Sequence, residues 1–274
     1  MTEELLQIMS LVSYGNAFLL KEETSSNYYP NNSVFQYINE LRFCDLKKTF
    51  FSANLKENVV ATDPIEWFKL LKKENCKKIS LHYYSYIENN SKPAYHYAGF
   101  VGGAQVWHIE TIFNNYSHFW AKKWELKNKK DEIDMKKWTV SFCRKTEKYP
   151  SENIHFDIDE MRKELDQSLS NISEFAHKEN LIDWENTFNQ AKNILSNPLP
   201  EKEYNRNDFI IFKNYSFQAQ QLLFATCKSW CFGGMGWWND NIFSDQIKGE
   251  KITQQLYETI NKSIIAVINS NLRI

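Results

Sequence analysis

The feature that most constrains the fold is a run of short apolar and aromatic segments in the middle of the chain, separated by residues that favour turns. β-branched and aromatic residues are enriched in strands, and short breaks between such runs are typical of hairpins. We interpret Asn89-Asn90 and Gly102-Gly103 as tight turns, and 127–137 as a longer charged loop. The pattern predicts an antiparallel meander of about five strands, at 78–87, 94–101, 104–113, 119–126 and 138–143.

Helical patterns lie on both sides of this region. Thr2 and Asp63 are residues that cap helices, and Pro64 suits a first helical position. Beyond the strands, apolar residues recur at helical spacing from a cap at Asp159 to a last helix at about 250–269. We therefore predict one α+β domain over 1–274, sheet-rich over 78–145 and helical over 157–270. The N-terminal and C-terminal helices are expected to cover one face of the sheet.

Composition sets limits on the partners and on the compartment. The 274 residues are 42% hydrophobic and 15% aromatic, which is enough apolar surface for a sizeable core. The net charge of −1 argues against a nucleic-acid partner, although 41–150 is basic and both flanks are acidic. The five cysteines include no Cys-x-x-Cys pair, so we expect buried free thiols and not a disulfide framework.

The N-terminal region has neither the positive start nor the unbroken apolar stretch of a secretory signal. It begins Met-Thr-Glu-Glu, and polar residues interrupt the apolar stretch that follows. No run elsewhere approaches the roughly 18–20 apolar residues of a membrane span. We therefore expect a cytoplasmic protein without a membrane partner.

One face of the predicted sheet is unusually rich in groups that titrate. With the two tight turns in place, His82 faces Tyr97, and Tyr97 faces His108, because directly opposed residues of antiparallel strands point to the same side. A second row on that side follows two residues along. It is made of Tyr84, Tyr95 and Glu110, while the opposite face is apolar.

This polar face has two interpretations. Two imidazoles and a carboxylate form a known set of transition-metal ligands, and His with Glu can perform general acid–base chemistry. Tyrosine and histidine are also ordinary residues on a sheet surface that faces solvent or a partner. We favour the second interpretation and predict neither a metal nor a cofactor.

A second candidate region is the sequence Cys-Phe-Gly-Gly-Met-Gly-Trp-Trp-Asn-Asp over 231–240. Its glycines end a helix and permit positive φ angles, but it lacks the Lys-Ser/Thr pair of a P-loop and does not follow a strand. In a structural interpretation, the tryptophans fill the space between the last two helices. In a functional one, the corner forms a binding rim, whose residues are Trp237, Trp238, Asn239 and Asp240.

The nine residues from Phe232 to Asp240, which follow one helix and precede the final one, resemble a C-terminal signature of uncharacterised bacterial proteins. Some of those proteins are immunity proteins that accompany polymorphic or contact-delivered toxins. The resemblance covers about the last sixty residues and, more loosely, the sheet. It implies a cytoplasmic protein that binds one partner tightly, and it transfers no catalytic residue.

The leading functional hypothesis is therefore an immunity protein that neutralises a cognate bacterial toxin by steric occlusion. The sequence contains no Gly-x-Ser-x-Gly elbow, no His-Glu-x-x-His motif and no kinase signature, which favours a binding protein over an enzyme. The alternative is a metal-assisted hydrolase, or another enzyme, that uses the face with His82, Tyr97, His108 and Glu110. A third interpretation, nucleic-acid binding through the lysines near 122–137, is the weakest.

Overall fold

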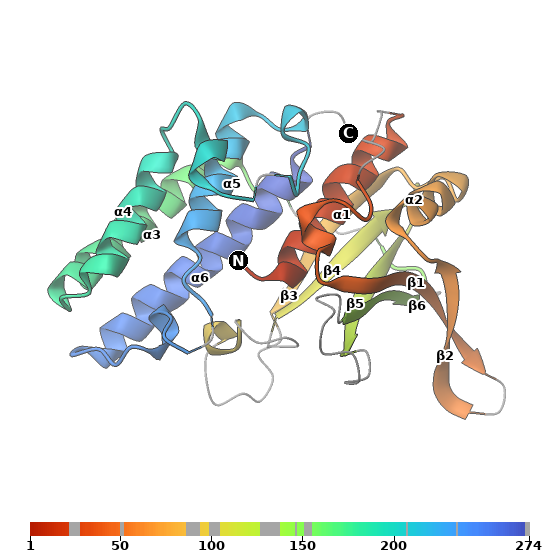
Figure 1. Cartoon of the computed structure of the whole chain (residues 1–274), viewed down its shortest axis with the longest axis horizontal. Coiled ribbons are helices and arrows are strands. Elements are labelled where there is room, and N and C mark those ends of the chain that lie inside the picture. Colours follow the sequence, from red (N-terminus) through yellow and green to blue (C-terminus); the bar gives the residue numbers. More distant parts are fainter. Residues whose placement is uncertain are drawn as a thin grey trace.

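The computed structural model describes most of the chain and shows an α+β protein (Figure 1). The described residues are 1–21, 28–49, 52–85, 94–98, 105–126, 138–145, 147–150, 155–206, 208–233 and 235–271.

The strands of the described residues form one six-stranded sheet in the order β2-β1-β6-β5-β4-β3. They are β1 (Ile38–Thr49), β2 (Ser52–Ala61), β3 (Lys78–Ser85), β4 (Gln105–Ile112), β5 (Ser117–Leu126) and β6 (Trp138–Lys145). β1 and β6 run parallel, while the other pairs are antiparallel. The sheet is therefore mixed, which corrects the predicted five-stranded antiparallel meander.

Two individual segments differ from the predicted strands. The segment predicted as a strand at 94–101 contains instead the 3-10 helix η2 (Ala94–Tyr97), so β3 pairs directly with β4. The hairpin of β1 and β2 was not predicted: the sequence of 34–43 is compatible with either a helix or a strand, and the charged residues after it do not form an apolar run. The hairpin extends the sheet beyond the predicted limits of 78–145. The predicted turns at Asn89-Asn90 and Gly102-Gly103 and the loop at 127–137 lie outside the described residues.

The helices follow the capping signals of the sequence. The side chain of Thr2 accepts a hydrogen bond from Leu5 N, and Asp63 caps the helix that starts at Pro64. The sequence predicted Asp159 as the cap of the third helix, but the cap is Asp157. The α-helices of the described chain are α1 (Glu3–Leu19), α2 (Pro64–Lys73), α3 (Ile158–Lys178), α4 (Ile182–Ile194), α5 (Phe217–Ser229) and α6 (Gln246–Asn269).

The short 3-10 helices lie in the connections between these elements. Besides η2, they are η1 (Ser33–Phe35), η3 (Pro200–Glu203), η4 (Phe212–Asn214) and η5 (Trp238–Asp240).

The helices occupy two places relative to the sheet (Figure 1). α1 and α2 pack on one face, which we call the inner face, and α3 to α6 form a bundle beyond the β3 edge. The expectation that the C-terminal helices cover a sheet face is therefore wrong: α6 contacts the edge strand β3 and the side of α1. Buried apolar side chains nevertheless connect the sheet and the bundle into one core.

Large aromatic rings fill the space between the inner face and α2. The ring of Phe43 stacks on Trp67 with centroids 4.4 Å apart, and Trp120 meets Trp67 edge to face at 5.4 Å. All three side chains are fully buried. Rings of this size dominate the energy of a core, which explains why α2 is fixed on the sheet.

Two asparagines cover the exposed edge of β3. The side-chain amide of Asn16, from α1, accepts a hydrogen bond from Ile79 N at 2.8 Å and donates one to Ile79 O at 2.7 Å. Asn269, near the end of α6, does the same with Leu81 at 2.8 and 2.9 Å. An unpaired edge is a site of unwanted strand pairing, so these amides take the place of a neighbouring strand. Asn269 also attaches the bundle to the sheet.

Candidate functional site

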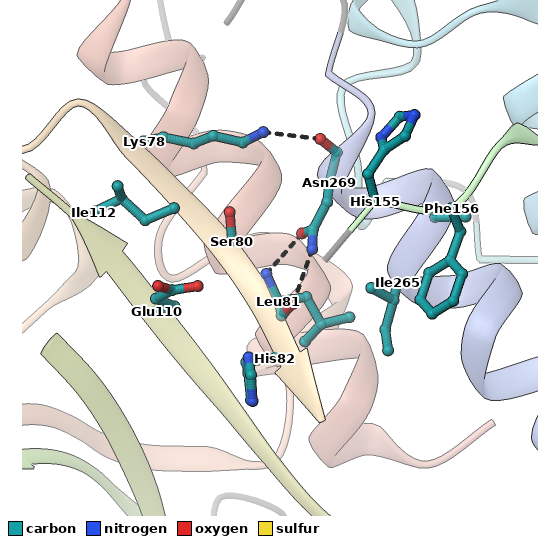
Figure 2. A pocket seen from close by; sticks show the side chains of 11 residues that line it. Lys78, Ser80, Leu81, His82, Glu110, Ile112, His155, Phe156, Ile265 and Asn269 are labelled. Atoms are coloured by element: carbon teal, nitrogen blue, oxygen red, sulfur yellow. Dashed lines mark hydrogen bonds between the residues drawn. The ribbon is translucent and has the colours of Figure 1, made fainter. Parts of the chain in front are cut away.

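A polar cavity lies where the outer face of the sheet meets the C-terminal turns of α6 (Figure 2). Its volume is about 310 Å³. The β3–β4 hairpin supplies one wall, α6 supplies another, and the segment just before α3 supplies the third. The residues around it are Lys78, Ser80, Leu81, His82, Glu110, Ile112, His155, Phe156, Ile265, Ala266 and Asn269.

The pairing of β3 with β4 brings the sequence-predicted histidines together. His82 lies directly opposite His108, and Ser80 lies opposite Glu110. Because side chains alternate along a strand, these residues share the outer face, while Ile79 and its neighbours share the inner one. His82, His108 and Glu110 therefore lie on one side of the sheet, as expected, but no strand separates the two histidines.

Tyr84 has the predicted position on β3, two residues beyond His82, whereas Tyr95 and Tyr97 belong to η2 and not to a strand. Tyr84 pairs with Val106 in the β3–β4 ladder, and Tyr97 ends η2. The side chains of both tyrosines lie outside the part of the structure that is described. The ring of Tyr95 is buried near Phe232 and Tyr257, with centroids 6.2 and 6.3 Å away. The predicted rows His82–Tyr97–His108 and Tyr84–Tyr95–Glu110 are thus wrong, because both required a strand at 94–101.

The cavity and the part of the sheet beside it are a low-dielectric environment for ionisable groups. Burial lowers the pKa of Lys78, which the nearby Glu110 carboxylate opposes, and the ammonium group donates to Asn269 O at 3.1 Å. Burial, with a smaller contribution from His82, lowers the pKa of His108 to about 4. At neutral pH the imidazole of His108 is therefore uncharged, while His82 and Glu110 are buried beside it.

The arrangement suits acid–base chemistry or a polar ligand better than a metal ion. Within the described residues, the ligand atoms of His82, His108 and Glu110 do not gather into a metal-sized group. A buried carboxylate and imidazole in a cavity are able to hold or exchange a proton, and Lys78 adds a donor. Sequence reasoning missed Lys78, His155 and Asn269, which come from strand, loop and helix positions distant in the chain.

The described cysteines do not provide a nucleophile. All five are buried free thiols, as the sequence predicted. Burial raises the pKa of Cys76, Cys143 and Cys227 to about 12 and raises that of Cys44 and Cys231 as well. A reactive cysteine needs its thiolate near neutral pH, so these residues do not suit nucleophilic catalysis.

The second region is the Gly-Trp corner, which we define as residues 231–247 at one end of the helical bundle. Trp238 is fully buried: its indole Nε1 donates to Thr253 Oγ1 at 2.9 Å, and its ring meets Phe188 edge to face at 5.2 Å. It is an interior residue of the bundle and not part of a rim. Trp237, by contrast, is 40% exposed and lies against Gly233, where an added Cβ would come within 2.3 Å of the indole ring.

The polar residues of the corner hold its backbone. Asn239 accepts a hydrogen bond from Gly233 N at 3.2 Å and donates to Gly233 O at 3.3 Å. Asp240 Oδ2 accepts from the N–H of Gly236 at 2.7 Å, and Gly236 has a φ of 85°, a conformation that glycine adopts without strain. Asn239 and the exposed Asp240 thus bond to the backbone of the corner itself. The most exposed apolar side chains of the corner belong to other residues.

Those other residues are large and apolar. Met235, Ile242 and Ile247 are 97%, 94% and 84% exposed. The corner is fixed to the bundle beside them, because Glu179 at the end of α3 accepts hydrogen bonds from the N–H and the hydroxyl of Ser244 at 2.7 and 2.5 Å. Sequence reasoning missed these three side chains, although each is an isolated aliphatic residue in a polar or glycine-rich stretch, which is a detectable signal.

Comparisons with models of known protein families, with curated proteins and with solved structures find no match to this chain. Among the described helices, none has both the length and the apolar character that crossing a membrane requires.

Proposed function

We propose that this chain is a partner-binding protein of the immunity type, which uses the Gly-Trp corner to dock on a cognate toxin and cover its active site. The observation that carries the proposal is the exposure of four large apolar side chains within thirteen residues, Met235, Trp237, Ile242 and Ile247. Single exposed apolar residues are common on protein surfaces, but several on one short segment are characteristic of an interaction site.

The corner also has the rigidity that tight binding needs. Trp238 attaches it to the bundle from inside, and Asn239 and Asp240 hold its own backbone. A surface that is ordered before binding loses less conformational entropy when a partner docks. Burying an exposed isoleucine or methionine contributes about 1.5–3 kcal/mol, so three such residues suffice to supply the central contacts of an interface. The resemblance of residues 232–240 to immunity-type proteins supports a toxin as the partner.

The test uses co-expression with the product of the neighbouring reading frame. We expect a one-to-one complex in size-exclusion chromatography with light scattering, and rescue of cells that the neighbouring product poisons. The triple variant Met235→Ser, Ile242→Ser, Ile247→Ser should weaken the dissociation constant by roughly a hundredfold or more. A matched variant, Leu126→Ser with Leu199→Ser, changes exposed apolar residues elsewhere and should bind within about threefold of wild type. Equal binding by the triple variant, or a neighbouring product that neither binds nor poisons, would overturn the proposal.

The polar cavity supports a second candidate function, an enzyme that uses general acid–base chemistry. The supporting observation is the burial of Glu110 and His82 beside Lys78 in a cavity of about 310 Å³. Ionisable groups buried together in a concave site are more frequent at active sites than elsewhere.

This candidate predicts turnover in a panel of chromogenic ester, phosphate and glycoside substrates. The activity should disappear in Glu110→Gln while the melting temperature stays within a few degrees, and it should survive in His177→Gln, which changes an exposed histidine of α3. Absence of turnover by the wild type, or full activity of Glu110→Gln, would remove the candidate.

A further inference from the structure

A second group of ligand-type side chains lies on the outer face of the sheet, on strands other than those of the cavity. Cys44 of β1 is directly opposite Cys143 of β6 in the parallel ladder. Glu57 of β2 is opposite Leu46, which is two residues beyond Cys44 and therefore on the same face of β1. The two Sγ atoms and a carboxylate oxygen all lie within 4.8 Å of one another.

The surroundings of this group are open on one side. Cys44 is fully buried and Cys143 is 8% exposed, but the β5 residue opposite Cys143 is Ala121, which is exposed and has only a methyl group. The side chain of Glu57 is 33% exposed. The thiols lie on the face opposite the packed aromatic rings of the inner face, such as Phe43 and Phe142, so binding an ion does not require those rings to move.

The ion pair of Glu57 does not compete strongly with a metal. Lys123 Nζ lies 3.5 Å from Glu57 Oε1, and the same ammonium group is 3.0 Å from Glu125. The lysine side chain is half exposed, and ion pairs at such positions contribute little to stability. Glu57 can therefore turn to a cation while Lys123 keeps its shorter contact with Glu125.

We propose that Cys44, Cys143 and Glu57 bind a zinc ion. Zn–S bonds of about 2.3 Å and Zn–O bonds of about 2.0–2.2 Å place tetrahedral ligand atoms roughly 3.5–3.8 Å apart, within reach of small side-chain rotations. Two sulfur ligands select zinc over magnesium or calcium, which prefer oxygen. The three side chains leave the fourth tetrahedral position to a water molecule.

Such an ion would connect the β1–β2 hairpin to β6, a strand distant in sequence. β1 and β2 belong to the N-terminal part of the chain, while β6 is about a hundred residues later. Binding to the folded sheet alone would stabilise it by mass action, because the unfolded chain does not hold the three ligands together. The site is independent of the proposed docking function, since it lies on the sheet and not on the corner.

Cobalt(II) is the probe that reports this site directly. We expect reduced, chelator-treated protein to take up a single equivalent of cobalt, with a thiolate-to-cobalt charge-transfer band and the intense visible bands of tetrahedral geometry. Zinc should displace the cobalt and bleach both features. Cys44→Ser and Cys143→Ser should each abolish the charge-transfer band or reduce it by about half, while Cys76→Ser, which changes a buried thiol elsewhere, should leave it intact.

Glu57→Gln keeps the fold measurable even where a cysteine variant is unstable, because its side chain is partly exposed. It should bind cobalt roughly tenfold more weakly than wild type, and zinc should raise the melting temperature of wild type more than that of Glu57→Gln. The proposal would be overturned by reduced wild-type protein without a charge-transfer band, by a band that persists in the double variant Cys44→Ser, Cys143→Ser, or by equal cobalt affinity in Glu57→Gln.

Discussion

The Gly-Trp corner and the polar cavity are built in opposite ways. The corner is held by contacts between residues close in sequence, because Asn239 and Asp240 bond to backbone groups of Gly233 and Gly236, only a few residues away. The cavity is assembled from β3, β4, the segment before α3 and the end of α6. The corner presents apolar side chains to solvent, whereas the cavity encloses ionisable ones. The first suits a protein partner and the second suits a small polar ligand or a proton transfer.

The largest expected effect separates the two tryptophans of the corner. Trp238→Ala removes a fully buried ring and its hydrogen bond to Thr253, so it should lower the free energy of unfolding by about 3–5 kcal/mol. Trp237→Ala removes the ring of a residue that is 40% exposed and that, among the residues the structure describes, makes no hydrogen bond comparable to that of Trp238, and it should cost less than about 1.5 kcal/mol. Urea unfolding monitored by circular dichroism measures both values. Equal costs would mean that the corner is not fixed by Trp238.

The second effect concerns the proton of His108, which lies opposite the cavity residue His82. The pKa of His108 is about 4 in the folded chain, against 6.5 for the ordinary side chain. As the pH falls, the unfolded chain therefore takes up this proton first. The corresponding stability is complete above pH 6.5 and is lost as the pH falls toward 4. Above pH 6.5, this contribution of His108 to the free energy of unfolding is up to about 3 kcal/mol.

His108→Gln should flatten the stability profile between these pH values, as measured by urea unfolding at several pH values. His177→Gln, on the exposed side of α3, should leave the profile unchanged. A wild-type stability that does not decrease on acidification would contradict the burial of the His108 imidazole on the outer face of the sheet.

A smaller effect tests the attachment of the bundle to the sheet. Asn269→Ala removes two hydrogen bonds to Leu81 and leaves a strand edge unpaired, so we expect a loss of about 2 kcal/mol. Asn16→Ala, which acts on Ile79 from α1, should cost a similar amount. The two variants should differ at the cavity, which Asn269 lines and Asn16 does not. Hydrogen exchange of the β3 and β4 amides should therefore accelerate more in Asn269→Ala than in Asn16→Ala.

The smallest effect is expected at the turn of the corner. Asp240→Ala removes the acceptor for Gly236 N and should cost about 0.5–1.5 kcal/mol, whereas Asp240→Asn keeps an acceptor and should cost about half as much or less. Both are measured by urea unfolding. A loss above about 3 kcal/mol in either variant would indicate that the corner is coupled to the core more widely than its local contacts suggest.

Sequence patterns anticipated local structure well and long-range pairing poorly. The start of α2 at Asp63-Pro64 and the extents of β4 to β6 follow from capping and from strand composition. The parallel contact of β1 with β6 leaves no local signal, and the hairpin of β1 and β2 is too charged to be recognised as strands.

The same distinction holds for the candidate sites. Alternation along the strands was enough to place His82, His108 and Glu110 on one face, but the predicted rows depended on a strand at 94–101 that the structure replaces with η2. In the corner, Trp238, Asn239 and Asp240 were recognised as a group, while the burial of Trp238 depends on packing against α3, α4 and α6. The exposed residues Met235, Ile242 and Ile247 became apparent only once the turn was placed.

The most direct test of the central claim is hydrogen–deuterium exchange of this protein, free and in complex with the neighbouring gene product. We predict that protection on binding centres on residues 235–247 and on the adjacent end of α3, with no change at β3 and β4. Protection confined to β3, β4 and the segment before α3 would contradict the account, because it would place the partner at the polar cavity and leave the exposed apolar corner unused.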